Sequence, residues 1–97
     1  HRYGELFVSV EKHEVTVAGE PILLTLKEFE LLCLFLENRG TVLTRDRILS
    51  EVWGYNFDGE NRTVDVHIKR LREKIKDHES WKIATIWGIG YKFEVRA

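Results

Sequence analysis

The sequence predicts a single α+β domain over residues 1–97, with short strands first, three helices next and a β-hairpin at the end. Three observations predict it. Strand-forming residues gather near the N-terminus, apolar residues recur at helical spacing between residues 26 and 76, and a glycine-bearing reversal joins two extended stretches near the C-terminus. With 43% hydrophobic residues, 32% charged residues and one proline, the composition is globular and not disordered.

The N-terminal part reads as a small antiparallel meander. Residues 6–10 and 14–17 are rich in Val, Phe and Thr, and a polar stretch separates them. A turn signal over residues 18–20 follows, and Pro21 suits the start of another extended stretch that reaches residue 24.

Capping residues mark the first two helices. Thr25 and Glu28 fit a capping box that opens a helix over about residues 26–36, and Gly40 ends that segment in the left-handed conformation. Residues 41–43 are too short for more than a connector or a one-residue bridge to a sheet. Thr44 then caps a second helix over residues 45–52, which Trp53 and Gly54 end.

The third helix, over about residues 62–76 with Asn61 as its cap, has two unlike faces. Its apolar stripe is formed by Val64, Ile68, Leu71 and Ile75. The opposite face carries Val66 surrounded by three cations at helical spacing, namely Arg62, Lys69 and Arg70. Arginine and lysine reach guanine edges and phosphates, and an apolar side chain suits the thymine methyl, so this face fits a DNA major groove.

The charge distribution supports that interpretation. The formal net charge is −1, but residues 1–60 carry −5 and residues 61–76 carry +4. A solvated helix face is the ordinary explanation of such a charge run and stays open as an alternative. Local basic groups nevertheless suffice for DNA binding, because counterion release depends on local phosphate contacts.

The C-terminal part predicts a hairpin. Residues 82–86 and 91–95 are extended, and residues 87–90 form the reversal between them. A basic helix preceded by a helix and a turn is typical of a helix-turn-helix, and the hairpin, about residues 82–95, would then be its wing.

Signals for other chemistry are weak. The lone Cys33 excludes an internal disulfide and a cysteine-cluster zinc site, and it is expected to pack as a small hydrophobe. His67 has no second ligand at metal-site spacing, and we expect Asp65 to pair with Arg72 or Lys69 along its own helix. No nucleophile, phosphate-loop or zinc signature is present, so neither an enzyme nor a cofactor or metal is expected. No apolar stretch is long enough to span a membrane.

Four segments together carry a family resemblance: LTLKEFELL at 24–32, VWG at 52–54, RTVDVHIKRLREKI at 62–75 and TIWGIGYKF at 85–93. The chain resembles the C-terminal DNA-binding domain of bacterial OmpR/PhoB-type two-component response regulators. This resemblance implies a winged helix-turn-helix with a four-stranded N-terminal sheet and a third helix in the major groove. By matching position, the residues implied in DNA contact are Arg62, Thr63, Val66, His67, Lys69, Arg70, Arg72, Trp53, Thr85, Trp87, Gly88 and Tyr91.

Within that set, the resemblance makes Arg70 a main base-reading residue. It also implies that the loop between the second and third helices can meet RNA polymerase; this loop comprises Gly54, Tyr55, Asn56, Phe57, Asp58, Gly59, Glu60 and Asn61. The resemblance further implies a phosphorylatable receiver domain before His1 and a sensor histidine kinase that phosphorylates it. The whole protein would act in the cytoplasm and bind promoter DNA as a tandem pair on direct repeats. The absence of an initiator Met and of a signal peptide favours a domain taken from a longer, intracellular protein.

Two points stay open at this stage. The family usually has arginine where this chain has Trp87, and tryptophan supplies no positive charge, so Trp87 either contacts the DNA near the sugar-phosphate backbone or packs on Tyr91. The domain as a whole could instead be a protein-interaction winged helix with Tyr55 and Phe57 as aromatic anchors.

Overall fold

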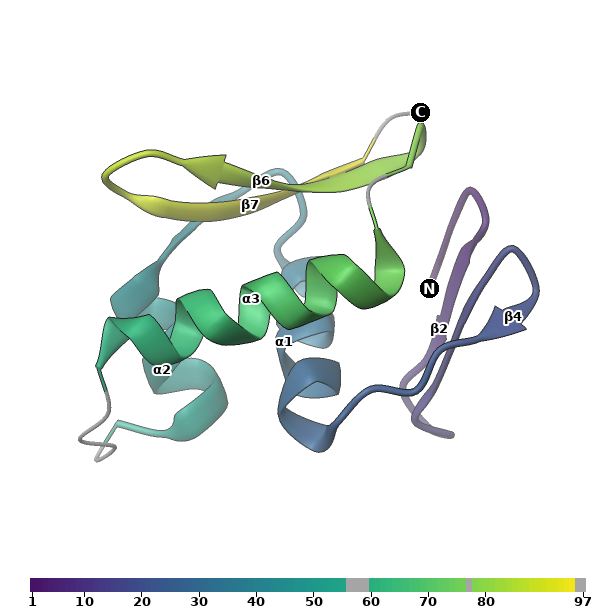
Figure 1. Ribbon diagram of the computed structural model, residues 1–97, viewed down its shortest axis with the longest axis horizontal. Helices are drawn as coiled ribbons and strands as arrows, with labels where there is room; N and C mark the ends of the chain where they lie inside the picture. Colours follow the sequence, from purple (N-terminus) through teal and green to yellow (C-terminus); the bar gives the residue numbers. More distant parts are fainter. Residues whose placement is uncertain (56–59, 77, 96–97) are drawn as a thin grey trace.

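The computed structural model describes residues 1–55, 60–76 and 78–95, and in this part of the chain two small antiparallel sheets flank three helices (Figure 1). The N-terminal sheet has the order β1-β2-β3-β4, and the C-terminal sheet has the order β5-β7-β6. The elements are β1 (Arg2–Tyr3), β2 (Leu6–Ser9), β3 (Glu14–Val17), β4 (Glu20–Pro21), α1 (Leu26–Glu37), β5 (Val42–Thr44), α2 (Arg45–Trp53), α3 (Asn61–Ile75), β6 (Trp81–Ile86) and β7 (Gly90–Val95).

The N-terminal sheet confirms the predicted meander and adds detail. Val8 pairs with Val15, and both point into the core, because alternate residues of a strand face the same side. The third stretch is shorter than expected, since β4 ends at Pro21 and residues 22–24 form no strand. The two-residue β1 completes the four strands that the family resemblance implied and the residue pattern had not indicated.

Helix α1 begins as the capping box predicts. The Thr25 hydroxyl accepts from the Glu28 backbone N–H at 3.2 Å, and the Glu28 carboxylate accepts from the Thr25 N–H at 2.9 Å. From Phe29 onward the helix buries its large apolar side chains against α2, α3 and the C-terminal sheet, whereas Leu26 in its first turn is 60% exposed. Phe35 stacks on Phe93 of β7 with ring centroids 6.3 Å apart. Cys33 lies half-buried and packs on the core, as expected of a small hydrophobe.

Strand β5 ties the hairpin to the start of α2. Leu43 pairs with Tyr91 and Thr44 with Gly90, so residues 42–44 form a short strand and not a mere connector. The Thr44 hydroxyl then caps α2 by accepting from the Arg47 N–H at 3.1 Å. A β-carbon at Gly90 would lie 2.0 Å from the Leu43 carbonyl oxygen, so only glycine allows this close approach.

Helix α3 lies across α1 and α2 and beneath the hairpin (Figure 1). Its predicted stripe is buried, with Val64, Ile68, Leu71 and Ile75 each at most 3% exposed. The predicted cap is wrong: Asn61 is the first helical residue, and Glu60 is the N-cap, with no side-chain hydrogen bond to the helix end. In the described residues, no helix has the length and hydropathy that crossing a membrane requires.

Among the residues that the structure describes, Glu28 is the charged residue buried in the core, at 1% exposure. It accepts from the Lys74 ammonium at 2.5 Å and so joins the start of α1 to the last turn of α3. Burial raises the pKa of the Glu28 carboxyl, but the hydrogen bonds from Lys74 and Thr25 outweigh burial and hold that pKa below its ordinary value. The carboxylate is therefore charged in the native state at neutral pH.

Glu28→Gln should lower the free energy of unfolding by about 1–3 kcal/mol at pH 7, because Lys74 loses its charged acceptor. Since the native pKa is depressed, this stabilisation is complete above the unfolded carboxyl's pKa of 4.5 and is lost as the pH falls through the native value. Urea denaturation from pH 7 to pH 3 should show the two proteins converging. Glu30→Gln, on an exposed pair with Lys27 at 3.6 Å, is the matched control and should change stability little. A constant gap across this range would contradict the argument.

Candidate nucleic-acid interface

The outward face of α3 presents the side chains that the sequence predicted there. Arg62, Lys69 and Arg70 are exposed, and Val66 stands among them at 39% exposure. In the described part of the chain, none of these three cations forms an ion pair or a side-chain hydrogen bond. Their positive charge is therefore free to meet an external anion.

A shallow hollow of about 410 Å³ opens over the first half of this face. It is lined by Glu60, Arg62, Thr63, Val66, His67 and Arg70. The first backbone N–H groups of a helix point outward without partners inside the helix, so an anion at this end meets both the guanidinium groups and the helix dipole. The hollow thus combines two guanidinium groups with the apolar side chain of Val66, and the Glu60 carboxylate is also part of its lining.

His67 and Trp53 form the edge of this surface towards α2. The His67 ring donates to the Thr63 carbonyl through Nδ1 at 2.8 Å, and the rings of Trp53 and His67 meet edge-on with centroids 4.8 Å apart. Both side chains are half-buried, as expected for boundary aromatics. These contacts fix the orientation of both rings, and so determine which part of each ring remains exposed to solvent.

For Asp65, the ion pair predicted from the sequence is wrong. It does not pair with Arg72 or Lys69 along its own helix; it accepts from Arg45 Nε of α2 at 2.8 Å and from the Tyr91 hydroxyl of β7 at 2.5 Å. We call these three residues the Asp65 cluster. No local spacing signalled Arg45, because it lies 20 positions earlier in the chain.

The pKa shifts of Asp65 and Tyr91 agree with the observed hydrogen bonds. Burial raises the pKa of the Asp65 carboxyl, but the hydrogen bonds from Tyr91 and Arg45 outweigh burial and leave that pKa below its ordinary value. Burial and the hydrogen bond to Asp65 raise the pKa of the Tyr91 hydroxyl. At neutral pH the carboxylate is therefore an acceptor and the phenol a donor.

Arg72 joins α3 to the hairpin from the other side of Tyr91. Its guanidinium donates twice to the Ile83 carbonyl, at 2.7 and 3.2 Å, and once to the Thr85 hydroxyl at 2.7 Å. It also lies over the Tyr91 ring, 5.4 Å from the centroid. Three of the predicted DNA-contacting residues, Arg72, Thr85 and Tyr91, are thus bonded to or stacked on one another.

The reversal over residues 86–90, which we call the wing tip, carries Trp87 at 87% exposure. This exposure excludes the alternative in which Trp87 packs on Tyr91. Ile89 is half exposed beside it, and Gly88 has φ of +79°, a left-handed value that favours glycine. The Ile89 N–H donates to the Ile86 carbonyl at 3.0 Å and closes the turn.

The predicted polymerase-contacting loop is described only at its ends. Gly54 ends α2 with φ of +100°, and Tyr55 is 84% exposed. Glu60 and Asn61 open α3. Asn56, Phe57, Asp58 and Gly59 lie outside the described residues.

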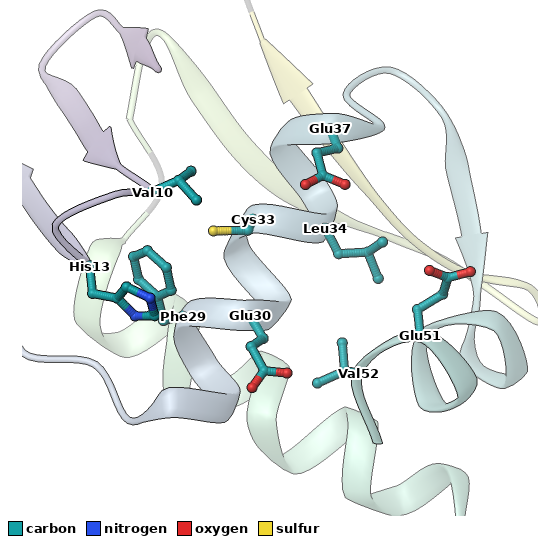
Figure 2. A pocket seen from close by; sticks show the side chains of 9 residues that line it. All are labelled: Val10, His13, Phe29, Glu30, Cys33, Leu34, Glu37, Glu51 and Val52. Atoms are coloured by element: carbon teal, nitrogen blue, oxygen red, sulfur yellow. The ribbon is translucent and has the colours of Figure 1, made fainter. Parts of the chain in front are cut away.

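A different hollow, between the N-terminal sheet, α1 and α2, has the opposite charge (Figure 2). Glu30, Glu37 and Glu51 line it with apolar side chains, and Cys33 points into it from α1. Burial raises the pKa of the Cys33 thiol, and the charges of Glu37 and Glu30 add to the rise, so the thiol stays protonated. Three carboxylates make this hollow unsuited to nucleic acid. Among the described residues, no group of His, Cys, Asp or Glu side chains is arranged to hold a metal ion.

The fold and the α3 surface together define a winged helix-turn-helix domain. The chain belongs to the family described as "Transcriptional regulatory protein, C terminal", whose profile matches residues 19–93. It is, more closely, an OmpR/PhoB-type response-regulator DNA-binding domain, as the sequence resemblance predicted. This family consists of transcriptional regulators and not of enzymes.

Individual relatives agree with this assignment. The chain is 46% identical to the sensory transduction protein RegX3 of Mycolicibacterium smegmatis, over 94% of the chain and 41% of that protein. The RstA DNA-binding domain of Klebsiella pneumoniae, solved in complex with RstA box, superposes with a TM-score of 0.86 at 31% identity, covering 97% of this chain and 95% of that one. Response regulator DrrB, the Thermotoga maritima OmpR/PhoB homolog, gives a TM-score of 0.87 at 38% identity, covering 97% of this chain and 43% of that one.

Arg72→Ala should lower the free energy of unfolding by about 1.5–3 kcal/mol, because three hydrogen bonds from a charged group are lost and two hairpin acceptors lose their donor. Lys69→Ala is the matched control, since it removes an exposed cation of the same helix that pairs with none of the residues that the structure describes. It should change stability by less than about 0.5 kcal/mol. Urea denaturation monitored by circular dichroism measures both. Equal stability of the two variants would show that Arg72 does not hold the hairpin.

Proposed function

We propose that the chain reads double-stranded promoter DNA with α3 in the major groove and the β6–β7 hairpin as a wing, and so controls transcription. The observation that carries this proposal is the outward face of α3, where three cations that are unpaired among the described residues surround an exposed valine. Arg70 would read base edges, Val66 would meet thymine methyl groups, and Lys69 would meet phosphates or flanking bases.

The other predicted contact residues complete this proposal. Arg62, Thr63 and His67, at the α3 hollow, would bind phosphates or flanking bases, and Trp53 would touch the backbone beside them. Thr85 and Gly88 of the hairpin would meet the adjoining backbone. Tyr91 was predicted to do so as well, but it is 5% exposed and its hydroxyl donates to Asp65, so it supports the hairpin from inside. Arg72, whose guanidinium donates to the hairpin, was also predicted to contact DNA, and we propose that it acts mainly by positioning the wing.

Features of the intact protein are proposals too, because this chain spans about 41% of the curated relative. We propose that a receiver domain precedes residue 1, that a sensor histidine kinase phosphorylates it, and that the protein acts in the cytoplasm. We also propose that the protein binds direct repeats as a tandem pair. Residues 54–61 would contact RNA polymerase. The structure of the RstA domain with its DNA box supports the DNA part of this list.

Arg70→Ala should weaken binding to a selected duplex by about 1–3 kcal/mol and relax base choice at one position, because a bidentate base contact is lost. Lys69→Ala should instead weaken all duplexes alike and lower the salt slope by about 1. Duplexes selected from a random pool, followed by fluorescence anisotropy at several salt concentrations, measure both effects.

Arg2→Ala is the control, because it removes an arginine of the N-terminal sheet that lies over the Phe7 ring, 5.2 Å from the centroid. It should leave binding unchanged. If Arg70→Ala binds selected and random duplexes as the unaltered protein does, α3 is not the reading element.

A protein-interaction role for the loop after α2 has one supporting observation, the 84% exposure of Tyr55. Exposed aromatic side chains often anchor partners. Tyr55→Ala should therefore leave duplex affinity unchanged and lower transcription from a bound promoter in a purified system with RNA polymerase. Unchanged transcription at full promoter occupancy would contradict the polymerase proposal, while lost duplex affinity would place Tyr55 on the DNA surface instead.

A further inference from the structure

The outward side of α1 carries a stripe of residues that the core does not bury. The stripe consists of Leu26, Glu30, Cys33 and Glu37, whose spacing places them on one face of the helix. Leu26 and Glu37 are exposed, and Glu30 and Cys33 are half-buried. This face of α1 is therefore apolar where the helix begins and acidic towards its end.

Two hollows lie along this stripe. One, of about 320 Å³, is the acidic hollow between the N-terminal sheet, α1 and α2 (Figure 2). The other, of about 270 Å³, runs beside residues 22–26. Both are lined by His13 and Phe29, whose rings stack with centroids 4.6 Å apart. Because the two hollows share this wall, we treat them as one surface and call it the α1 groove.

The α1 groove exposes apolar side chains that folding does not explain. Val10 is 49% exposed, Leu23 is 89% exposed and Leu26 is 60% exposed, and all three line the groove. A single exposed apolar residue is ordinary, but apolar side chains gathered along one groove are typical of an interaction site.

The α1 groove is also negatively charged. Glu37 and Glu51 form no ion pair with any residue that the structure describes, and Glu30 lies 3.6 Å from the Lys27 ammonium in an exposed pair. Burial and the charges of Glu37 and Glu30 raise the pKa of the Cys33 thiol, so the negative potential reaches the floor of the groove. A partner that fits this groove must bring positive charge together with apolar surface.

The α1 groove is separate from the α3 surface. No residue that lines either hollow belongs to α3 or to the β6–β7 hairpin. A partner in the α1 groove therefore leaves Arg62, Val66 and Arg70 of α3 uncovered.

We propose that the α1 groove docks a basic amphipathic helix of a partner protein, with its apolar side chains at the Leu26 end and its cations at the Glu37 end. Amphipathic helices bind apolar grooves through one face, and opposite charges at the rim fix their orientation. The carboxylates select this partner over nucleic acid and over an acidic peptide. The inference goes beyond DNA binding by α3 and does not depend on it.

The first test uses a labelled peptide of leucine and lysine that forms an amphipathic helix. Fluorescence anisotropy should show saturable binding that weakens as salt is added, because salt screens exposed charges. A peptide of the same pattern with glutamate for lysine should bind about tenfold more weakly or worse. The same should hold for a leucine–lysine peptide whose sequence order gives no apolar stripe. Equal binding of the two lysine peptides would overturn the inference, because it would reduce the contact to unspecific charge attraction.

Variants then locate the binding site. Glu37→Gln and Glu51→Gln should each weaken the amphipathic peptide about two- to fivefold, the range expected for one exposed ion pair. Leu26→Ala should weaken it about fivefold through lost apolar contact. Glu20→Gln, which changes an exposed carboxylate of β4 that lines neither hollow, is the control and should leave binding unchanged. All four side chains are exposed, so circular dichroism should show an unaltered fold. Affinity that none of the three groove variants changes would overturn the inference.

The single cysteine provides an independent test. Cys33 points into the groove (Figure 2), so its alkylation by iodoacetamide at alkaline pH should block the peptide. The Cys33→Ser protein, treated in the same way, should still bind it. Backbone amide NMR shifts on adding the peptide should gather on α1, the end of α2 and the loop before β3, and shifts elsewhere would contradict the proposed site. Self-association of the protein that Glu37→Gln abolishes would assign the groove to a second copy and overturn the choice of partner. Failure to bind any duplex would remove the proposed function of α3 and leave this inference standing.

Discussion

Burial of the apolar stripe of α3 is the constraint on which the other features depend. Val64, Ile68, Leu71 and Ile75 are each at most 3% exposed, and each contributes about 1.5–3 kcal/mol when buried. Turning the helix by one position would expose several of them at once. The cost would consume most of the 5–15 kcal/mol that stabilises a domain of this kind. The cations on the opposite face point outward because the stripe must point inward.

This constraint explains how much of the molecule could be predicted from its sequence. The periodicity of apolar residues gave the third helix and its outward side chains, and the Thr25 and Thr44 caps gave the starts of α1 and α2. These signals are local, since they depend on residues three or four positions apart. The N-cap of α3 was predicted wrongly because Asn61, a common cap residue, stands one position inside the helix that actually forms.

Contacts between distant segments could not be predicted in the same way. Asp65 had cations at helical spacing, and a local pair was the natural expectation. In the structure the Asp65 carboxylate instead accepts hydrogen bonds from Arg45 of α2 and Tyr91 of β7. These two residues come close to Asp65 only once the helices have packed and the hairpin has paired with β5. The short β5 strand could not be predicted either, because a segment of three residues is too short to show the alternation of a strand, and its pairing with β7 forms only in the folded chain. The exposure of Trp87 also depends on where the wing tip stands.

Helix α3 thus has three surfaces with separate roles. One is apolar and holds the helix in the core, one is basic and faces outward, and between them Asp65 and Arg72 bond to the hairpin. Because these polar contacts meet the two strands just before and just after the wing tip, helix and wing form one body and not two hinged parts. A duplex bound to both must therefore match a fixed separation between helix and wing. If the chain reads DNA as proposed, the groove width and flexibility of the duplex would affect affinity even at base pairs that no side chain touches.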